Sequence, residues 1–318
     1  MAALIPILLL LVGFVALILG ANWLVNGATS VGVRAKLSPL IIGLTIVAFG
    51  TSLPEMIVNV FSCAKGSPGL AIGNIIGSNT MNILLILGVS ALVWPIDVSR
   101  ISIRRDIPVG FLATLAITLM VNVFYTEKAH TINAIEGSVL LLLGFAYLLL
   151  TMLKKGPKEE DEVPQEAMPW GKTILFIVAG IAGLYLGGEL VSRNAQTLAR
   201  LWGMSESAIG LTVIATATSL PELITSVVAA TKQNSGIAIG NVLGSNIMNI
   251  FFVLGVSALI TPLPFETAMN RQLIILFAAN ILMLIFVFTG KGHKISRWEG
   301  ALLTLGYIGF LWISLAMH

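Results

Sequence analysis

Residues 43–96 recur at positions 210–263 with a constant offset of 167 positions and no insertion, and 30 of the 54 aligned residues are identical. Two motifs recur in both copies: Gly/Ala-Thr-Ser-Leu-Pro-Glu, and Ala-Ile-Gly-Asn-x-x-Gly-Ser-Asn-x-Met-Asn-Ile. Each copy therefore places one acid, Glu55 or Glu222, at an equivalent position of an otherwise apolar stretch. A chain with such a duplication is expected to fold as two related halves that bring the paired motifs together.

Composition indicates the class of protein. Hydrophobic residues make up 57% of the chain, charged residues make up only 10%, and the mean hydropathy is +0.96, which is typical of a polytopic membrane protein. A helix needs about 20 apolar residues to cross a bilayer, and long unbroken runs favour helices over a barrel of alternating strands. The sequence predicts spans at about 3–26, 39–63, 69–94, 106–124, 132–152, 171–192, 207–230, 236–260, 270–289 and 297–317.

The outer spans also correspond between the halves. Under the same offset, glycines and leucines of the first span meet those of the sixth, and the fifth and tenth spans share Glu-Gly and a later Tyr after a short gap. An odd number of crossings per half requires the second half to enter from the opposite side of the membrane. The prediction is an all-α membrane protein of ten transmembrane helices in two inverted five-helix repeats: residues 1–153, a polar cytoplasmic linker at 154–170, and residues 171–318.

The loops on the two sides differ in positive charge. Of the 18 Lys and Arg residues, 13 fall on the side that holds the 154–170 linker, and cytoplasmic loops are the ones enriched in these residues. Both termini are therefore expected outside. We read the net charge of +3 as a sign of membrane orientation and expect no nucleic-acid partner. We also expect a functional monomer in the lipid bilayer of a prokaryotic plasma (inner) membrane.

The first motif should supply oxygen ligands. Proline lacks an N–H and its ring collides with the carbonyl four residues back, so the helix should open before Pro54 and Pro221. Opening frees backbone carbonyls, with those of Ala48 and Ala215 among the candidates. Residues three and four apart share a helical face, which groups hydroxyls with each acid: Thr51 and Ser52 with Glu55, and Thr218 and Ser219 with Glu222.

The second motif adds further oxygens. Ser78 and Asn82 are four residues apart, and Ser245 and Asn249 repeat this pattern in the second copy. For Asn79 and Asn246, the sequence leaves helix packing and a role at the site equally open. The glycines of the motif form small-xxx-small surfaces that allow close approach of helices.

Two acids inside the membrane need compensating charge. An ionised acid at mid-bilayer costs at least about 2.5–3.5 kcal/mol, and neither motif segment contains a basic residue. Mobile cations or protons can supply the charge. Carboxylate, amide and hydroxyl oxygens suit Ca²⁺ and Na⁺, whereas Zn²⁺ and copper prefer the missing thiolate and imidazole ligands. The sequence carries no nucleophile, zinc or phosphate-loop motif of an enzyme, so we expect neither catalysis nor a cofactor.

The paired motifs closely resemble those of the sodium/calcium exchangers of the cation/calcium antiporter superfamily, over essentially the whole chain. The resemblance implies a central Ca²⁺ site at Glu55 and Glu222 with carbonyls near Thr51 and Thr218. It implies flanking Na⁺ sites at Ala48, Ser52, Ser78, Ala215, Ser219 and Ser245. Asn82 and Asn249 would complete the central site. Some prokaryotic relatives hold an aspartate in place of Asn249, which makes this chain more symmetric and less acidic.

The predicted activity is Na⁺/Ca²⁺ antiport by alternating access, with electrogenic Ca²⁺ export if three Na⁺ exchange for one Ca²⁺. Helices one and six, rich in glycine, are candidates for elements that slide past the remaining bundle. A proton/calcium antiporter and a K⁺-dependent exchanger share the carboxylates and remain alternatives. A calcium channel fits inverted halves with broken helices less well.

Overall fold

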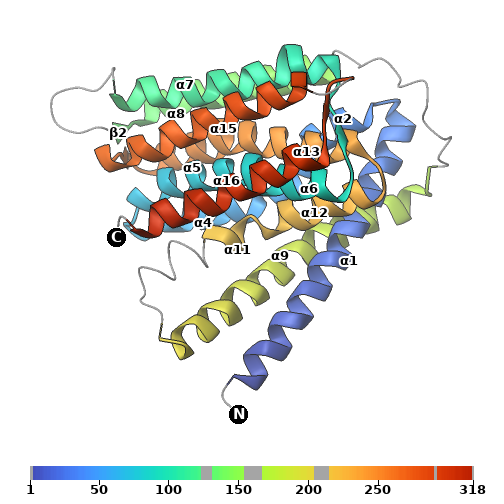
Figure 1. Cartoon of the computed structure of the whole chain (residues 1–318), viewed down its shortest axis with the longest axis horizontal. Helices are drawn as coiled ribbons and strands as arrows, with labels where there is room; N and C mark the ends of the chain where they lie inside the picture. Colours follow the sequence, from blue (N-terminus) through green and yellow to red (C-terminus); the bar gives the residue numbers. More distant parts are fainter. Residues whose placement is uncertain (1–2, 123–130, 154–166, 204–214, 290–291, 317–318) are drawn as a thin grey trace.

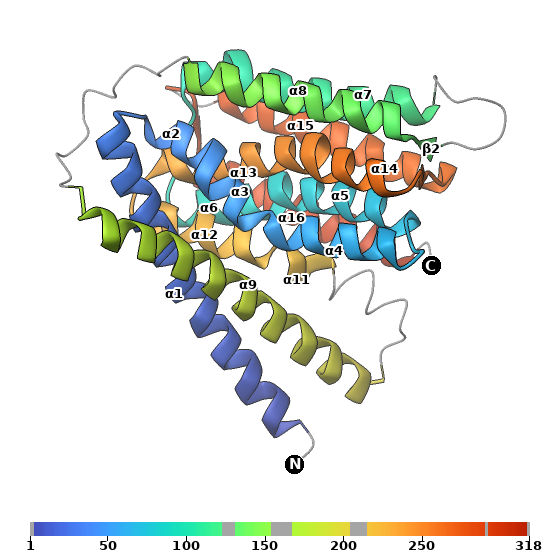
Figure 2. The ribbon, with the colours of Figure 1, turned by 180° about the vertical axis from the view of Figure 1, so that it is seen from behind.

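The structure is a computed structural model that describes residues 3–122, 131–153, 167–203, 215–289 and 292–316. It is mostly helical, and the elements run along the chain in the order shown in Figures 1 and 2. The α-helices of the first half are α1 (Leu4–Ala35), α2 (Pro39–Ile42), α3 (Ala48–Thr51), α4 (Leu53–Ala64), α5 (Gly69–Met81), α6 (Leu87–Val93), α7 (Ile107–Asn122) and α8 (Ala134–Leu153). Those of the second half are α9 (Trp170–Leu201), α11 (Ala215–Thr218), α12 (Leu220–Thr231), α13 (Ser235–Met248), α14 (Gly255–Ile260), α15 (Asn270–Thr289) and α16 (Arg297–Ala316).

Seven helices in the described part of the chain are long and apolar enough to cross a membrane. The bent pair Pro39–Thr51 and Leu53–Ala64 raises this number to eight if the pair is one span, and Leu220–Thr231 is a shorter apolar helix. The residues before α11 lie outside the described ranges, as do residues 154–166 of the predicted linker. The chain therefore has the architecture of a polytopic helical membrane protein, while the count of ten spans stays a prediction.

Helices α1 and α9 are the longest, with 32 residues each. Both helices extend beyond the predicted membrane spans, which end at residues 26 and 192, because the polar residues after those positions stay helical. Thr29 Oγ1 donates to the Val25 carbonyl, and Asn194 Nδ2 donates to the Leu190 carbonyl, each four residues back. A helix of this length spans about 48 Å, more than the roughly 30 Å hydrocarbon core, so both helices must tilt or protrude.

The two long helices pack against each other in opposite directions. A Cβ on Gly13 would meet Val191, one on Gly20 would meet Leu184, and one on Gly27 would meet Ile177. The partner number falls as the α1 number rises, so the pair is antiparallel. Both views show α1 and α9 side by side and diagonal to the remaining helices. Since α1 and α9 are the corresponding first helices of the two halves, their antiparallel packing supports an inverted relation.

The halves interlock. Helix α6 of the first half packs on α16 of the second, where Gly88 faces Gly300; α14 packs on α8 in the same way, where Gly255 faces Gly137. Short antiparallel strands repeat this exchange: β1 (Ile96–Asp97) pairs with β4 (Lys294–Ile295), and β2 (Thr131–Ile132) pairs with β3 (Leu263–Pro264). These strands could not be predicted from the sequence, because their two-residue length leaves no alternating pattern.

Several helices contain wider turns that the sequence also did not predict. The wider turns are the π-helical segments η1 (Gly43–Val47), η2 (Asn82–Ile86), η3 (Ser102–Asp106) and η5 (Asn249–Leu254). The segment η6 (Thr267–Met269) is a 3₁₀ turn, which is tighter than an α-helix. Two of them, η2 and η5, begin at equivalent asparagines of the second motif. Such insertions often occur at functional sites, because they release backbone groups from the regular ladder.

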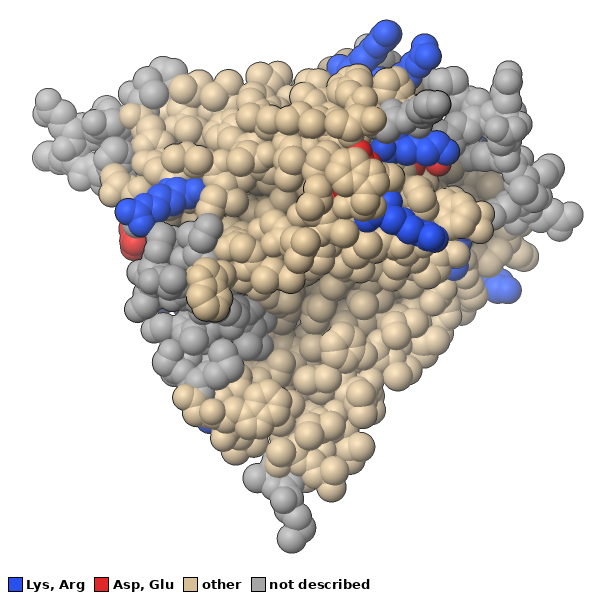
Figure 3. Space-filling model, in the orientation of Figure 1, with Lys and Arg blue, Asp and Glu red and all other residues tan. Residues whose placement is uncertain are grey.

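On the face drawn in Figure 3, charged side chains lie toward the two ends of the bundle. Figure 3 shows Lys and Arg gathered at the right and upper right of the molecule with a smaller group at the left, separated by a broad uncharged surface. The helices α7, α15 and α16 run across that surface in the same orientation (Figure 1). This distribution fits a protein whose middle faces lipid and whose two ends face water.

Candidate functional site

The first motif lies where two helices break. Ser52 separates α3 from α4 with a bend of 42°, and Ser219 separates α11 from α12. Both serines have φ and ψ outside the helical range, at −83° and 2° and at −93° and 8°. Pro54 and Pro221 follow at the second position of the new helix, where a missing N–H does no harm. The predicted opening before each proline is thus confirmed.

The breaks bring the two glutamates into one cluster. Ser52 Oγ donates to Glu222 Oε1 at 3.1 Å, and Ser219 Oγ donates to Glu55 Oε1 at 3.2 Å. Glu55 is 0% exposed and Glu222 is 1% exposed. Each serine lies three residues before one glutamate and donates to the other, so the spacing that groups each serine with its own acid does not identify its hydrogen-bond partner. The break at the serine removes the helical register on which that spacing depends.

Hydroxyls of the second motif join the same cluster. Ser219 Oγ also bonds to Ser78 Oγ at 3.1 Å, and Thr51 Oγ1 lies 3.5 Å from Ser245 Oγ. Ser78, Ser245 and Thr51 are all buried. The serines and threonine of one half therefore contact the serines of the other, and the four motif copies form a single polar centre.

The asparagines cross between the halves too. Asn82 Nδ2 donates to Asn246 Oδ1 at 2.9 Å, and Asn249 Nδ2 donates to Asn79 Oδ1 at 3.1 Å. Each bond is the symmetry copy of the other under the sequence offset. Like the serine–glutamate bonds, they show a two-fold relation between the halves that passes through the centre.

Four buried oxygens of the centre have no hydrogen-bond donor among the residues that the structure describes. They are Oε2 of Glu55 and Glu222 and Oδ1 of Asn82 and Asn249. Each pair comes from equivalent positions in the two halves. A buried acceptor without a donor costs on the order of 1–3 kcal/mol, and oxygens of this kind are the ligands that a hard cation takes.

The remaining predicted residues occupy less central roles in the described contacts. The Ala48 carbonyl accepts from the Ser52 N–H at 3.0 Å and from Thr51 Oγ1 at 3.2 Å, so it has not lost its helical partner as predicted. Thr218 is buried and engaged in an interaction, and Ala215 begins α11, with its side chain outside the described set.

Asn241 is an amide of the second motif that lies outside the predicted set of site residues. Its Oδ1 accepts from Thr51 Oγ1 at 3.0 Å, and its Nδ2 donates to the Glu222 carbonyl at 3.2 Å and to Ser226 Oγ at 2.9 Å. The equivalent Asn74 donates to Asn59 Oδ1 at 2.8 Å, and Asn59 is the counterpart of Ser226 under the sequence offset. The signal was available, because Asn241 lies in the repeated motif, but the spacing alone does not show which polar atoms it faces.

The described part of the centre contains two acids, Glu55 and Glu222. Among the described residues, no group of three or more His, Cys, Asp or Glu side chains could hold a metal ion. A cation in the centre would therefore rely on two carboxylates together with neutral amide, hydroxyl and carbonyl oxygens. Such a set is compatible with Ca²⁺ or Na⁺ and poor for zinc.

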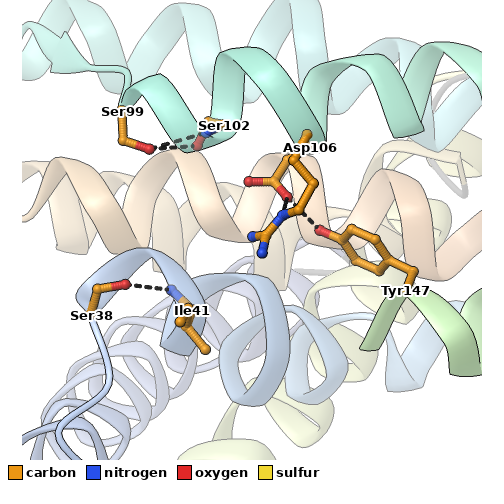
Figure 4. A network of polar contacts seen from close by, with 7 residues as sticks. Ser38, Ile41, Ser99, Ser102, Asp106 and Tyr147 are labelled. Atoms are coloured by element: carbon orange, nitrogen blue, oxygen red, sulfur yellow. Dashed lines mark hydrogen bonds and ion pairs between the residues drawn. The ribbon is translucent and has the colours of Figure 1, made fainter. Parts of the chain in front are cut away.

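A second buried polar cluster joins η3 to α8. Arg105 Nε bonds to Asp106 Oδ1 at 2.6 Å, and Tyr147 Oη donates to the same oxygen at 3.0 Å (Figure 4). Ser99 and Ser102 form a separate hydroxyl pair at the start of this segment. The cluster contains no residue of the repeated motifs, and its contacts tie α8 to the end of the bundle.

Known proteins resemble this chain in sequence and in fold. The model of the sodium/calcium exchanger protein family matches residues 5–153 and 172–316. The chain is 38% identical to the putative antiporter CaxA of Alkalimonas amylolytica, with 98% of each chain covered. It is 30% identical to the sodium/calcium exchanger MaX1 of Methanosarcina acetivorans, with 96% of this chain and 97% of that protein covered.

A solved structure agrees. The sodium-calcium exchanger NCX_Mj, soaked with 2.5 mM Na⁺ and 10 mM Sr²⁺, superimposes with a TM-score of 0.82 at 33% identity and covers 99% of both chains. The match extends over both halves and includes every helix that carries a motif. The protein is thus a multi-pass membrane protein of a prokaryotic exchanger type, and it belongs to the sodium/calcium exchanger family.

Proposed function

We propose that the protein is a secondary antiporter that exchanges Na⁺ for Ca²⁺ across the membrane. The observation that carries the proposal is the set of four donor-free oxygens on Glu55, Glu222, Asn82 and Asn249. They are buried, they come from symmetric positions, and they lie in one hydrogen-bonded centre. The family match and the named relatives support Na⁺ and Ca²⁺ as the transported ions.

Ca²⁺ would take the two carboxylates together with neutral oxygens. Ca²⁺ accepts about 6–8 oxygen ligands in flexible geometry, and the central candidates are Glu55, Glu222, Asn82 and Asn249 with carbonyls near Thr51 and Thr218. Na⁺ would use the hydroxyls of Ser52, Ser78, Ser219 and Ser245 and the carbonyls of Ala48 and Ala215, and the Ala48 carbonyl would then have to release the hydrogen bond from Thr51 Oγ1. The shared serine–glutamate bonds place these two groups of ligands in direct contact.

Competition for the carboxylates would couple the two fluxes. One Ca²⁺ or two Na⁺ balance two ionised carboxylates, so loading one ion species displaces the other. If three Na⁺ exchange for one Ca²⁺, each cycle moves one net charge and gains about 2.3 kcal/mol per 100 mV. An inside-negative potential would then favour Ca²⁺ export.

Radioactive Ca²⁺ uptake into proteoliposomes tests the driving ion. Vesicles loaded with Na⁺ and diluted into Na⁺-free buffer should take up Ca²⁺, and equal Na⁺ on both sides should stop uptake. K⁺ and H⁺ gradients are imposed one at a time in parallel vesicles. Uptake that follows only the pH gradient would replace this proposal with a proton/calcium antiporter, and uptake without any counter-ion would indicate a channel.

Acidification should inhibit transport. Protons bind the same carboxylate oxygens as Ca²⁺, so lowering the pH increases the competitor and weakens apparent Ca²⁺ affinity. We expect the KM for Ca²⁺ to rise as the pH falls from about 8 to 5, with the maximal rate recovered at high Ca²⁺. Initial uptake rates at fixed Na⁺ gradient, measured across this pH range, check the prediction. A KM independent of pH would contradict a site of paired carboxylates.

We further propose that α1 and α9 move together against the rest of the bundle during alternating access. Their glycine-lined, antiparallel contact is continuous, and it is far more extensive than their contacts with other elements. A disulfide between cysteines introduced at facing positions of α1 and α12, in a Cys63→Ser background, should stop exchange and release it on reduction. Full exchange with the cross-link formed would remove this assignment.

The topology remains part of the proposal. We propose two inverted five-helix repeats, residues 1–153 and 171–318, joined by a cytoplasmic linker at 154–170, with both termini outside and the chain acting as a monomer in the inner membrane. The antiparallel α1–α9 pair and the basic end of the molecule support this arrangement. Cysteines introduced at each terminus should react with a membrane-impermeant reagent on intact cells. Labelling only after permeabilisation would show the opposite orientation.

A further inference from the structure

Four asparagines of the second motif form a closed set of hydrogen bonds across the two-fold relation. Asn79 Nδ2 donates to the backbone carbonyl of Asn246 at 3.1 Å, and Asn246 Nδ2 donates to the backbone carbonyl of Asn79 at 3.4 Å. The Oδ1 atoms of these two residues accept from Asn249 and Asn82, at 3.1 and 2.9 Å. All four side chains are buried.

These hydrogen bonds determine which atom of the Asn82 and Asn249 side-chain amides, the oxygen or the NH₂ group, is left without a partner. A backbone carbonyl only accepts, so the atom of Asn79 that faces Asn246 must be its NH₂ group, and its Oδ1 must point the other way. That oxygen only accepts, so the atom of Asn249 that faces it must be an NH₂ group. The oxygen of Asn249 is then the free atom. The same steps, starting from Asn246, leave the oxygen of Asn82 free.

The free oxygens are the ones without donors. Asn82 Oδ1 and Asn249 Oδ1 are buried and unpartnered, as are the Oε2 atoms of Glu55 and Glu222. If the side-chain amide of Asn82 or Asn249 rotated by 180°, it would present two N–H groups to a cation. It would also lose its hydrogen bond to Asn246 or Asn79, respectively. The π-helical segments η2 and η5 begin at Asn82 and Asn249, so the backbone hydrogen bonding also changes at these two residues.

We propose that Asn79 and Asn246 are positioning residues that hold the amides of Asn249 and Asn82 with their oxygens toward the transported cation. This inference deepens the proposed function and rests on it for the identity of the cation. It assigns a specific pairing: Asn79 acts on Asn249, and Asn246 acts on Asn82. Each positioning residue serves the ligand of the opposite half rather than the one three residues along its own helix.

Crossed double-mutant cycles test the pairing. Single and double alanine variants at 79, 82, 246 and 249 are compared for the KM of Ca²⁺ in Na⁺-driven uptake and for Ca²⁺ affinity by calorimetry in Na⁺-free detergent. Asn79→Ala should raise the KM about tenfold, the effect of losing one buried hydrogen bond, while the maximal rate changes little. Adding Asn79→Ala to Asn249→Ala should change the KM no further, because there is no amide left to orient.

The matched control uses residues on the same helix. Asn79→Ala combined with Asn82→Ala should multiply the two effects, since Asn79 does not hold the Asn82 side chain. The reciprocal cycles should couple 246 with 82 and not with 249. Effects that multiply in the 79/249 and 246/82 cycles, or coupling of equal size in all four cycles, would overturn the proposal. Loss of folding in both Asn79→Ala and Asn246→Ala, seen by size-exclusion chromatography, would show a structural role and overturn it as well.

The two readouts separate this inference from the proposed function. If the wild-type protein binds Ca²⁺ but shows no Na⁺-driven uptake, the exchange activity is wrong, and the cycles in Ca²⁺ affinity still decide the positioning role. If the wild-type protein exchanges normally and the 79/249 cycle is multiplicative, only the positioning role is wrong. A wild-type protein without Ca²⁺ affinity contradicts both.

Discussion

Replacing Glu55 or Glu222 with glutamine should abolish Na⁺/Ca²⁺ exchange while leaving the protein folded. Glutamine keeps the Oε1 acceptor that Ser219 or Ser52 uses, so the local hydrogen bonds survive. The second oxygen, which has no donor, becomes an NH₂ group that repels a cation. Loss of an outer-shell partner already costs about 10–100-fold in metal affinity, so loss of a direct carboxylate ligand should reduce uptake at least a hundredfold.

The measurement is initial Ca²⁺ uptake by proteoliposomes under a fixed Na⁺ gradient. Glu189→Gln is the matched control, since Glu189 lies on α9 in an exposed pair with Arg193 and should leave uptake near the wild-type rate. Size-exclusion profiles and thermal melting compare folding of all three variants. Exchange that persists in a well-folded Glu55→Gln or Glu222→Gln variant would reject the central carboxylate site.

Much of the candidate site follows from the repeat and from proline chemistry. The constant offset pairs Glu55 with Glu222, and the missing N–H of Pro54 and Pro221 determines where each helix opens. Both features are local properties of the sequence. The structure brings the paired residues into one buried centre, as the duplication predicted, and the superposition on a known exchanger gives the same membrane fold.

The partners of each side chain could not be predicted in the same way. Helical spacing assigns Ser52 to Glu55, whereas the structure pairs Ser52 with Glu222 across the two-fold relation. Spacing describes neighbours on one helix, and it contains no information about which helix of the other half lies opposite. For the same reason Asn79 and Asn246 stayed open between packing and function, although their bonds are among the most specific in the centre.

The lengths of α1 and α9 show a different limit. Hydropathy marks the part of a helix that lipid surrounds, and it does not mark where helical hydrogen bonding stops. Polar residues after position 26 bond to carbonyls four residues back or face α9, as Ser30 does when it bonds to Thr173 at 2.9 Å. Helix α1 ends only at Ala35, and the C-cap residue Lys36 that follows has a left-handed φ of 55°.

Gly300→Ala should strongly destabilise the protein, whereas Gly309→Ala on the same helix should not. A Cβ on Gly300 would lie 2.6 Å from the Gly88 carbonyl oxygen and 2.9 Å from Ala91 Cβ, and a backbone atom cannot move aside as a flexible side chain can. A Cβ on Gly309 would meet nothing within 4 Å. Overpacking typically costs about 1–3 kcal/mol, while alanine in an open helical position gains up to about 1 kcal/mol over glycine.

The consequence of Gly300→Ala should reach the cation site. Helix α16 contacts both α6 and η2, and η2 begins at Asn82. Pushing α16 away from Gly88 therefore shifts the segment that presents one of the donor-free oxygens. We expect a melting temperature several degrees lower and weaker Ca²⁺ affinity for Gly300→Ala, with both unchanged or improved for Gly309→Ala, by melting in detergent and by calorimetry. Equal behaviour of the two variants would mean that the close contact between α6 and α16 does not hold the centre in place.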